Sequence, residues 1–451
     1  MAIIGLDSAP PALVFERWRD QLPTLGSLMR HGAWGRLRSC HPPITVPAWS
    51  SMLSGRDPGE LGIYGFRDRR SREYGDTRIA SARSVQHPRV WDLLGDRCRT
   101  VLVGVPQTYP PPPINGAVVS CFLTPSTAKA TTHPAELRRE IELLCGRYAH
   151  DIEGFRQVQR EVVVERARRK TQQDFAVARH LLASRPWELF LLVLMGTDRI
   201  QHACWPATDD DAEGWQILLD YYRELDAGIA SLLERLGSET AVLIVSDHGA
   251  KRMEGGLFLN QWLIANGYLV LHEAPVAQVP LTADRIDWRR TVAWSDGGYC
   301  GRIYLNVAGR EPRGTVPANR VESLLGELAE GLAAIPRPDG GGAIGITAHR
   351  PSDLYRRVEG IPPDLLVYLG DLSWRALGSV GPAGLYGSAN DTGPDGANHD
   401  WDGILIANDP CASYGGRELI GLGLGDIAPS VLSYFDYATA APAGSLRFPR
   451  Q

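Results

Sequence analysis

The sequence predicts an α/β protein with a mostly parallel central sheet, helices on both faces of that sheet and a smaller α+β insertion. Short apolar runs of strand length recur along the chain, and amphipathic helical patterns lie between them. This alternation is typical of a sheet that is covered by helices on both sides. The rhythm changes over residues 260–395, where a helix is expected near 317–334 and a Gly-rich segment follows.

Five apolar runs are expected to form buried parallel strands, at residues 2–7, 100–106, 189–196, 241–247 and 403–407. The clearest helix covers residues 215–237, because apolar side chains recur there at steps of three and four, and Gly237 is expected to end it. The predicted organisation is a core formed by residues 1–259 and 396–451 with an insertion at 260–395. In such sheets the functional groups gather beyond the carboxyl ends of the strands.

Composition excludes several classes of function. The formal charge of -5 gives no basic surface for a nucleic acid polymer. The seven cysteines contain no C-x-x-C pair, which argues against a disulfide framework and against a thiolate zinc site. The sequence shows no export signal and no apolar stretch long enough for a membrane span, so a cytoplasmic protein is expected. Arginine far outnumbers lysine, which occurs only at 129, 170 and 251, and this bias suggests a GC-rich bacterial genome.

Acidic and histidine side chains follow three of the predicted strands. Asp7 ends the first strand, and Asp247 and His248 end another, where Gly249 allows a sharp turn. Asp198 and His202 stand four residues apart at the start of a predicted helix and therefore share one face. Each also has a structural interpretation, because Asp7 and Asp198 could cap local turns and His202 could pack below a cap.

A late histidine, His399, immediately precedes the last strand, and taken alone it could be an ordinary loop residue. The combined set of oxygen and nitrogen ligands suits zinc or a similar divalent ion. Clustered carboxylates repel one another and lose solvation, whereas two divalent cations would neutralise them. Taken together, these acidic and histidine residues therefore favour a metal site over separate roles as helix and turn caps.

A threonine stands at the start of a short predicted helix that runs to about Ser54. Pro47 suits the first helical position, which puts Thr45 at the positive end of the helix dipole. Thr45 is then either an N-terminal cap or a nucleophile that meets phosphate at the helix end.

The motifs "GLDSAPP", "PPITVPAWSSMLSG", "GTDRIQHACW", "VSDHGA" and "GDIAPSVL" resemble the alkaline phosphatase superfamily. Within it they are most similar to the nucleotide pyrophosphatase and type I phosphodiesterase branch, in a bacterial group of predicted phosphohydrolases and phosphomutases. The resemblance implies that one ion is held by Asp7, Thr45, Asp247 and His248, and the other by Asp198, His202 and His399. It also implies that Thr45 is the nucleophile and becomes phosphorylated.

The function implied by the resemblance is that of a two-metal phosphoric-ester hydrolase, a phosphatase or phosphodiesterase acting on a small-molecule phosphate ester. Zinc is the expected metal, with manganese or another divalent ion as alternatives. A phosphomutase or phosphotransferase with the same nucleophile is an alternative function, and a non-catalytic metal-loaded binding protein is another. Sulfatase chemistry is disfavoured, because Thr45 replaces the reacting Cys or Ser and the x-Pro-x-Arg pattern lacks its arginine.

The sequence departs from the resemblance in the loop after the nucleophile. Phe66 occupies the position where phosphodiesterases carry an asparagine that holds a phosphoryl oxygen. Arg67 is either a replacement donor or a solvated loop arginine. Trp49, Tyr64, Phe66 and Trp205 lie beside the ligand motifs, where they could either line an apolar wall for the substrate or pack in the core. The sequence leaves the substrate and the oligomeric state open.

Overall fold

A computed structural model describes residues 1–437, and the chain divides into two compact units. The larger unit comprises Met1–Phe66, Ala80–Ala250 and the described chain from His399 onward. The smaller unit comprises Arg67–Ile79 and Lys251–Asn398. This division differs from the predicted one in two ways: residues 67–79, predicted in the core, lie in the smaller unit, and that unit extends over 251–398 where the insertion was predicted at 260–395. Residues 438–451 of the predicted C-terminal core segment lie outside the described residues.

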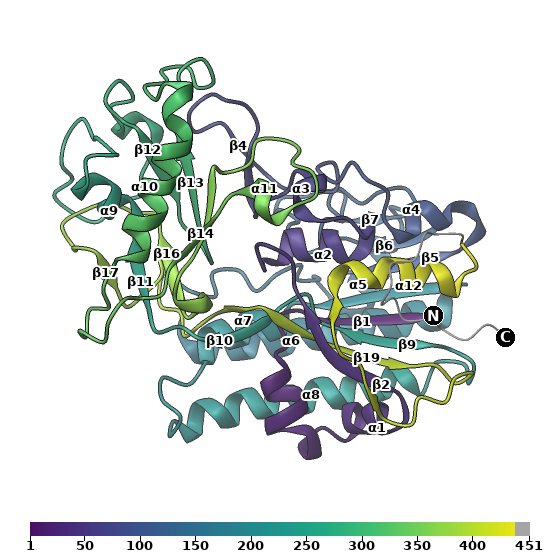
Figure 1. Ribbon diagram of the computed structural model, residues 1–451. Helices are drawn as coiled ribbons and strands as arrows, with labels where there is room; N and C mark the ends of the chain where they lie inside the picture. The colour runs from purple at the N-terminus through teal and green to yellow at the C-terminus, as the bar shows by residue number, and fades with distance from the viewer. Residues whose placement is uncertain (438–451) are drawn as a thin grey trace. The chain divides into compact units, whose positions relative to one another are not determined.

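A ten-stranded sheet forms the centre of the larger unit (Figure 1). The strand order is β20-β2-β19-β9-β1-β8-β5-β6-β7, and β21 also pairs with β2. The strands are β1 (Ala2–Leu6), β2 (Ala33–Arg38), β5 (Thr100–Val103), β6 (Gly116–Val119), β7 (Thr132–His133), β8 (Leu189–Leu194), β9 (Val242–Val245), β19 (Asp402–Asn408), β20 (Arg417–Glu418) and β21 (Leu422–Gly423). Strands β9, β1, β8, β5 and β6 are adjacent and parallel, which confirms the predicted mostly parallel sheet.

One predicted strand direction is wrong. The apolar run at 403–407 forms β19, which pairs antiparallel with both β9 and β2. An apolar run carries no information about direction, because buried strands of either direction have the same pattern. The reversal matters, since it brings the start of β19 to the edge where the parallel strands end.

Helices cover both faces of this sheet. Along β1, Ile4 and Leu6 pack in one hydrophobic cluster, and Ile3 packs in another on the opposite face. The first cluster includes α1 (Pro23–His31), α5 (Leu137–Cys145), α6 (Arg160–Ser184), α7 (Gly196–Cys204) and α8 (Ala212–Leu233), and the second includes α2 (Thr45–Ser54), α3 (Pro58–Leu61), α4 (Val90–Leu94) and α12 (Ile427–Tyr434). Helix α8 ends at Leu233, so Gly237 is not its terminating residue.

The smaller unit contains an antiparallel four-stranded sheet of order β12-β13-β15-β14 and a three-stranded sheet of order β16-β11-β17. Its strands are β3 (Arg67–Arg69), β4 (Thr77–Ile79), β11 (Gly255–Phe258), β12 (Ala293–Asp296), β13 (Gly301–Leu305), β14 (Thr347–His349), β15 (Leu365–Tyr368), β16 (Trp374–Leu377) and β17 (Tyr386–Gly387); its helices are α9 (Leu259–Ala265), α10 (Val321–Ala333) and α11 (Pro351–Leu354). The β3–β4 hairpin belongs here because Arg69 pairs with buried Glu311 and Tyr74 stacks on Trp288. Both contacts join residues far apart in sequence, so the pattern along the chain gave no sign of them.

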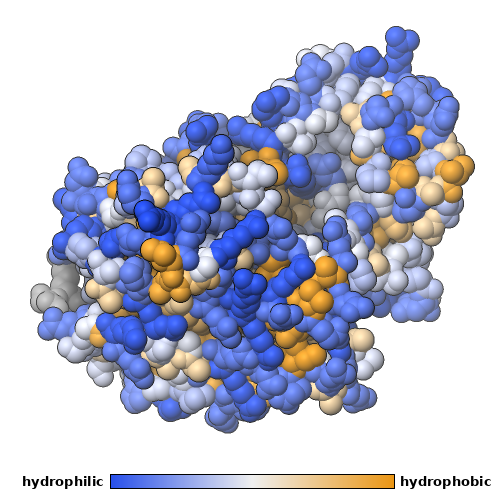
Figure 2. All heavy atoms as spheres, turned by 180° about the vertical axis from the view of Figure 1, so that it is seen from behind, coloured by the Kyte–Doolittle hydropathy of each residue, from blue (hydrophilic) through white to orange (hydrophobic). Residues whose placement is uncertain are grey.

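Hydrophobic side chains on the face seen in Figure 2 occur in small groups among hydrophilic ones. Small apolar groups of this kind are normal for a protein surface. Within residues 1–437, no helix combines the length and the apolarity that crossing a membrane requires. All seven cysteines lie in the described part of the chain and each is a free thiol. The cytoplasmic location stays a prediction.

Candidate active site

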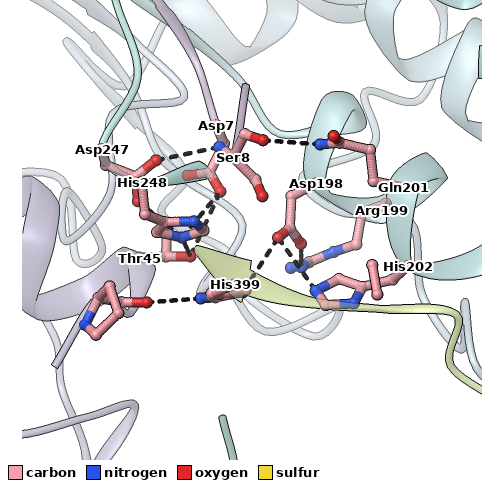
Figure 3. A network of polar contacts seen from close by, with 12 residues as sticks. Asp7, Ser8, Thr45, Asp198, Arg199, Gln201, His202, Asp247, His248 and His399 are labelled. Atoms are coloured by element: carbon pink, nitrogen blue, oxygen red, sulfur yellow. Dashed lines mark hydrogen bonds and ion pairs between the residues drawn. The ribbon is translucent and has the colours of Figure 1, made fainter. Parts of the chain in front are cut away.

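Three adjacent parallel strands bring acidic residues to one edge of the sheet. Asp7 follows β1, Asp198 lies in α7 just after β8, and Asp247 follows β9. Because the carboxyl ends of parallel strands share one edge, the three carboxylates converge there, and all three are buried (Figure 3). His399 reaches the same edge because β19 runs in the opposite direction to β9, so the residues before β19 lie where the parallel strands end.

Five of the seven predicted ligands form two sets that share a histidine. In one, ligand atoms of Asp7, Asp247 and His248 lie within 4.8 Å of one another; in the other, those of Asp198, His248 and His399 do. His202 adds its Nε2 atom at 3.3 Å from Asp198 Oδ1. The resemblance assigned His248 to one ion only, whereas in the structure this imidazole lies close to both sets of ligands.

Two histidines present the same ring nitrogen to the carboxylates. His248 Nδ1 donates to the carbonyl oxygen of Gly249 at 3.0 Å, and His399 Nδ1 donates to that of Pro43 at 2.8 Å. A carbonyl oxygen can only accept, so each Nδ1 carries the proton and each Nε2 offers a lone pair. Burial lowers the pKa of His248 to about 4, and burial together with His248 lowers that of His399 well below its usual value. Both rings are therefore neutral.

The lone pairs on these rings face carboxylate oxygens at short range. His248 Nε2 lies 3.1 Å from Asp247 Oδ2, and His399 Nε2 lies 3.4 Å from Asp198 Oδ1. Asp198 Oδ1 and Asp247 Oδ2 are fully buried, and neither makes a hydrogen bond of acceptable geometry within the described chain. Acceptors that face each other without a proton repel, and a divalent cation between them would remove that repulsion.

The pKa shifts of the three carboxyl groups also favour a bound cation. Burial raises the pKa of Asp7 well above its usual value, and the charge of Asp198 raises it further. Burial and the charge of Asp7 do the same to Asp247. For Asp198, burial opposes ionisation, but His202 and the charge of Arg199 outweigh it and hold the pKa well below the usual value. Three ionised carboxylates in this space require added positive charge, so the residues fit two divalent ions.

Thr45 is the first residue of α2, and Ile44 is the N-cap residue. The Thr45 hydroxyl does not cap the helix; it donates toward Asp7 Oδ1 at 3.4 Å, and His248 Nε2 lies 3.3 Å from it. The interpretation of Thr45 as a cap is therefore wrong. Helix α2 also begins earlier than predicted, so Pro47 is its third residue instead of its first. The hydroxyl lies at the positive end of a ten-residue helix and beside the acidic set.

Trp49 fixes the Asp7 carboxylate by a hydrogen bond. Its indole Nε1 donates to Asp7 Oδ2 at 2.7 Å, and the side chain is only 1% exposed. Gly5 makes room for the ring, because a Cβ atom at Gly5 would lie 2.3 Å from the indole. Trp49 is thus placed to orient the Asp7 carboxylate, and its ring packs in the core, which is the alternative to an apolar wall for the substrate.

The other predicted substrate contacts are three aromatic residues that pack against the larger unit's own side chains and one arginine, Arg67, in the smaller unit. Tyr64 is buried at 1% exposure, and the ring of Phe66 packs edge-on against Phe122 at 6.1 Å. Trp205 contacts Trp215 in the larger unit. Arg67 belongs to the smaller unit, where it lines a cavity of about 1180 Å³ together with Arg69 and Arg302.

Three further residues support the predicted ligands and were not singled out in the sequence. Ser8 donates its backbone N–H to Asp247 Oδ1 at 3.2 Å, and Gln201 Nε2 donates to the carbonyl oxygen of Ser8 at 2.9 Å. Arg199 donates to Asp198. Arg199 and Gln201 stand inside the motif "GTDRIQHACW", next to the predicted ligands Asp198 and His202. This proximity in the sequence was the sign that they could belong to the site, but only the structure shows where each side chain points.

The type I phosphodiesterase / nucleotide pyrophosphatase family model matches residues 1–402. Among solved structures, human ectonucleotide pyrophosphatase / phosphodiesterase 5 is similar, with a TM-score of 0.57, 13% sequence identity, and coverage of 99% of this chain and 97% of that chain. The murine protein of the same name, solved as an inactive variant in complex with AMP, gives a TM-score of 0.58 with the same identity and coverage. At this identity the likeness concerns the fold alone. No curated protein matches the sequence significantly.

Proposed function

The chain belongs to the type I phosphodiesterase / nucleotide pyrophosphatase family, whose enzymes are metal-dependent hydrolases of phosphoric esters, and from this premise we propose that it hydrolyses its substrate through a covalent phosphothreonine on Thr45. The observation that carries the proposal is the position of the Thr45 hydroxyl, which lies 3.4 Å from Asp7 Oδ1 and 3.3 Å from His248 Nε2 at the amino end of α2. A hydroxyl in that position is suited to act as a nucleophile.

The proposed metal ligands are the seven residues at the sheet edge. Asp7, Thr45, Asp247 and His248 would hold one ion, and Asp198, His202 and His399 would hold the other. Two divalent ions, with zinc favoured by the oxygen and nitrogen ligands and manganese as an alternative, would neutralise the carboxylates, lower the pKa of the hydroxyl and offset the charge of the phosphoryl group.

The protein contributes two displacements at the same phosphorus atom. In the first, Thr45 Oγ1 forms a bond to phosphorus while the bond to the leaving alcohol breaks, and the alcohol departs with the proton that the threonine gives up. In the second, water attacks the phosphorus, the bond to Oγ1 breaks, and Thr45 regains its hydroxyl proton. Because Thr45 is the first residue of α2, the N–H groups of the first turn would donate to the phosphoryl oxygens at the positive end of the helix.

The proposed substrate is a small phosphate ester, and nucleotides are the first class to test because the murine neighbour was solved with AMP. The test is a panel of phosphate monoesters, diesters and nucleotides with the metal-loaded protein, followed by a substrate that is chiral at phosphorus. Two inversions retain configuration, so retention supports the covalent route and inversion would contradict it. Isomerisation without release of phosphate would instead identify a mutase.

A further inference from the structure

The two oxygen atoms of the Asp198 carboxylate have different kinds of partner. Its Oδ2 atom accepts a hydrogen bond from Arg199 Nη1 at 2.5 Å. Its Oδ1 atom faces the imidazole Nε2 atoms of His202 at 3.3 Å and His399 at 3.4 Å. One oxygen is thus occupied by a guanidinium, and only the other is directed to the histidines (Figure 3). The rotation of this carboxylate therefore decides which oxygen can serve as a ligand.

Arg199 is itself held in place by a second carboxylate. Its Nε donates to Asp151 Oδ1 at 3.0 Å and its Nη2 donates to Asp151 Oδ2 at 3.2 Å, which is a two-pronged arginine–carboxylate pair. The guanidinium lies 4.7 Å from the ring centre of Phe155, and the Arg199 side chain is only 6% exposed. The planar fork of an arginine can bridge Asp151 and Asp198 at once, which a lysine cannot do.

Asp151 lies outside the strand ends, between α5 and α6, and its side chain is 23% exposed. The preceding segment is fixed to the body of the larger unit. Ala149 N–H donates to Gln173 Oε1 at 3.0 Å, and His150 Nδ1 donates to the Ser120 carbonyl oxygen at 3.0 Å. Asp151 is therefore anchored independently of the metal ligands.

We propose that Arg199 and Asp151 form a positioning pair that turns Asp198 Oδ1 toward the histidines, and that Asp151 thereby sets the affinity of this one metal site. The inference rests on the proposed function, because it presupposes an ion held by Asp198, His202 and His399. The charge of Asp151 offsets the guanidinium, which would otherwise weaken a cation bound beside it. Within the described chain, no lysine or arginine forms an ion pair with Asp7 or Asp247, so neither of these carboxylates has a comparable arginine partner.

The test is zinc affinity, measured without substrate. Chelator-stripped full-length protein is reloaded with zinc in competition with a chromogenic chelator, which yields the two dissociation constants. In Asp151→Asn, one dissociation constant should rise by about 10-fold or more, as outer-sphere changes at metal sites do, while the other changes by less than about twofold. Asp151→Glu keeps the charge and should recover part of the loss. Asp220→Asn, which breaks an exposed pair with Arg223 on α8, is the matched control and should change neither constant.

A double variant shows whether Asp151 acts through Arg199. In an Arg199→Met background, adding Asp151→Asn should change the affinity by less than about twofold, because the residue through which it acts is gone. An undiminished effect in that background would overturn the proposal, as would two unchanged constants in the single variant or an equal rise of both. If the unmodified protein fails to bind two ions, the proposed function fails as well. If it binds two and Asp151→Asn alters neither, only this inference fails.

Discussion

The indole N–H of Trp49 donates to Asp7 Oδ2 at 2.7 Å, while the other oxygen of the same carboxylate lies 3.4 Å from the Thr45 hydroxyl. Trp49 and Thr45 stand one helical turn apart on α2, so one helix supplies the proposed nucleophile and also orients the carboxylate beside it.

Replacing Trp49 by Phe should therefore weaken metal binding while the core stays packed. The phenyl ring keeps most of the apolar contact but cannot donate to Asp7, so affinity for the ion at Asp7 should fall by about 10- to 100-fold. Equilibrium zinc titration measures this. Trp91→Phe is the matched control, because Trp91 is also buried on the same sheet face and its indole N–H has no hydrogen-bond partner within the described chain. Equal losses in both variants would show that the hydrogen bond is unimportant.

The sequence predicted much of this site for a simple physical reason. Apolar runs mark the strands, and the residue after each run lies at a known edge of a parallel sheet, so Asp7, Asp198 and Asp247 could be brought together without coordinates. The location of His399 at that edge followed from the resemblance. The antiparallel direction of β19, which explains that location, could not be read from an apolar pattern.

The supporting contacts could not be predicted. Trp49 reaches Asp7 by the direction of an indole ring, and Asp151 reaches Arg199 across residues that are distant in sequence. Membership of Arg69 in the smaller unit depends on its pairing with Glu311, which is 242 residues away. Such contacts depend on the packing of the whole unit, whereas the periodicity of apolar residues predicts only the helix or strand in which they lie.

His399→Ala should remove one of two bound ions. Asp198 and His202 alone would remain as ligands of that ion, and the loss of one of three protein ligands weakens a site sharply. Metal analysis of the purified variant should give about one ion per chain, compared with about two in the parent. His202→Ala should behave in the same way, and His180→Ala, a half-buried histidine on α6, should keep both ions. Full occupancy of both sites in His399→Ala would show that its assignment is wrong.

His150 should make the fold sensitive to acid. Burial lowers the pKa of His150 from its ordinary 6.5 to about 4. A depressed pKa in the folded state means that protonation favours unfolding, so the contribution is present above about pH 6.5 and is lost as the pH falls toward 4. One such proton changes the free energy of unfolding by at most about 1.4 kcal/mol per pH unit.

Urea unfolding of metal-free protein at several pH values between 7.5 and 4.5 measures this dependence. His150→Gln can still donate to the Ser120 carbonyl oxygen but does not titrate, so its stability should fall less steeply with pH than that of the parent. Parallel curves for the two proteins would count against a titrating His150.

Glu311→Gln should destabilise the smaller unit. Glu311 is fully buried and accepts from both Arg69 at 2.7 Å and Arg72 at 3.2 Å, so its removal leaves the Arg69 guanidinium buried without its counter-charge. Breaking a buried pair costs about 3–5 kcal/mol, whereas an exposed pair contributes about 0.2–1 kcal/mol. Thermal or urea unfolding compares this variant with Glu327→Gln, which breaks the exposed pair with Arg320. Equal stability of the two variants would contradict a structural role for the β3–β4 hairpin in this unit.

Thr45→Ala tests the proposed nucleophile while sparing most of the metal site. Asp7, Asp247 and His248 remain, so the ion beside them should be largely retained, but turnover should fall by several orders of magnitude, as it does when a covalent nucleophile is removed. Thr45→Ser should keep partial activity, because the oxygen remains while the methyl group that restricts its rotamer is lost. Metal analysis of each variant separates loss of the nucleophile from loss of the ion.

The most direct measurement is a rapidly quenched reaction of the metal-loaded enzyme, in which the peptide containing residues 39–56 is searched for phosphate by mass spectrometry. A covalent route predicts one phosphoryl group on Thr45 in the parent and none in Thr45→Ala, whose turnover is nearly abolished. If the peptide carries no phosphate at any quench time and Thr45→Ala hydrolyses phosphate esters at nearly the parent rate, water attacks the substrate directly and Thr45 is not the nucleophile.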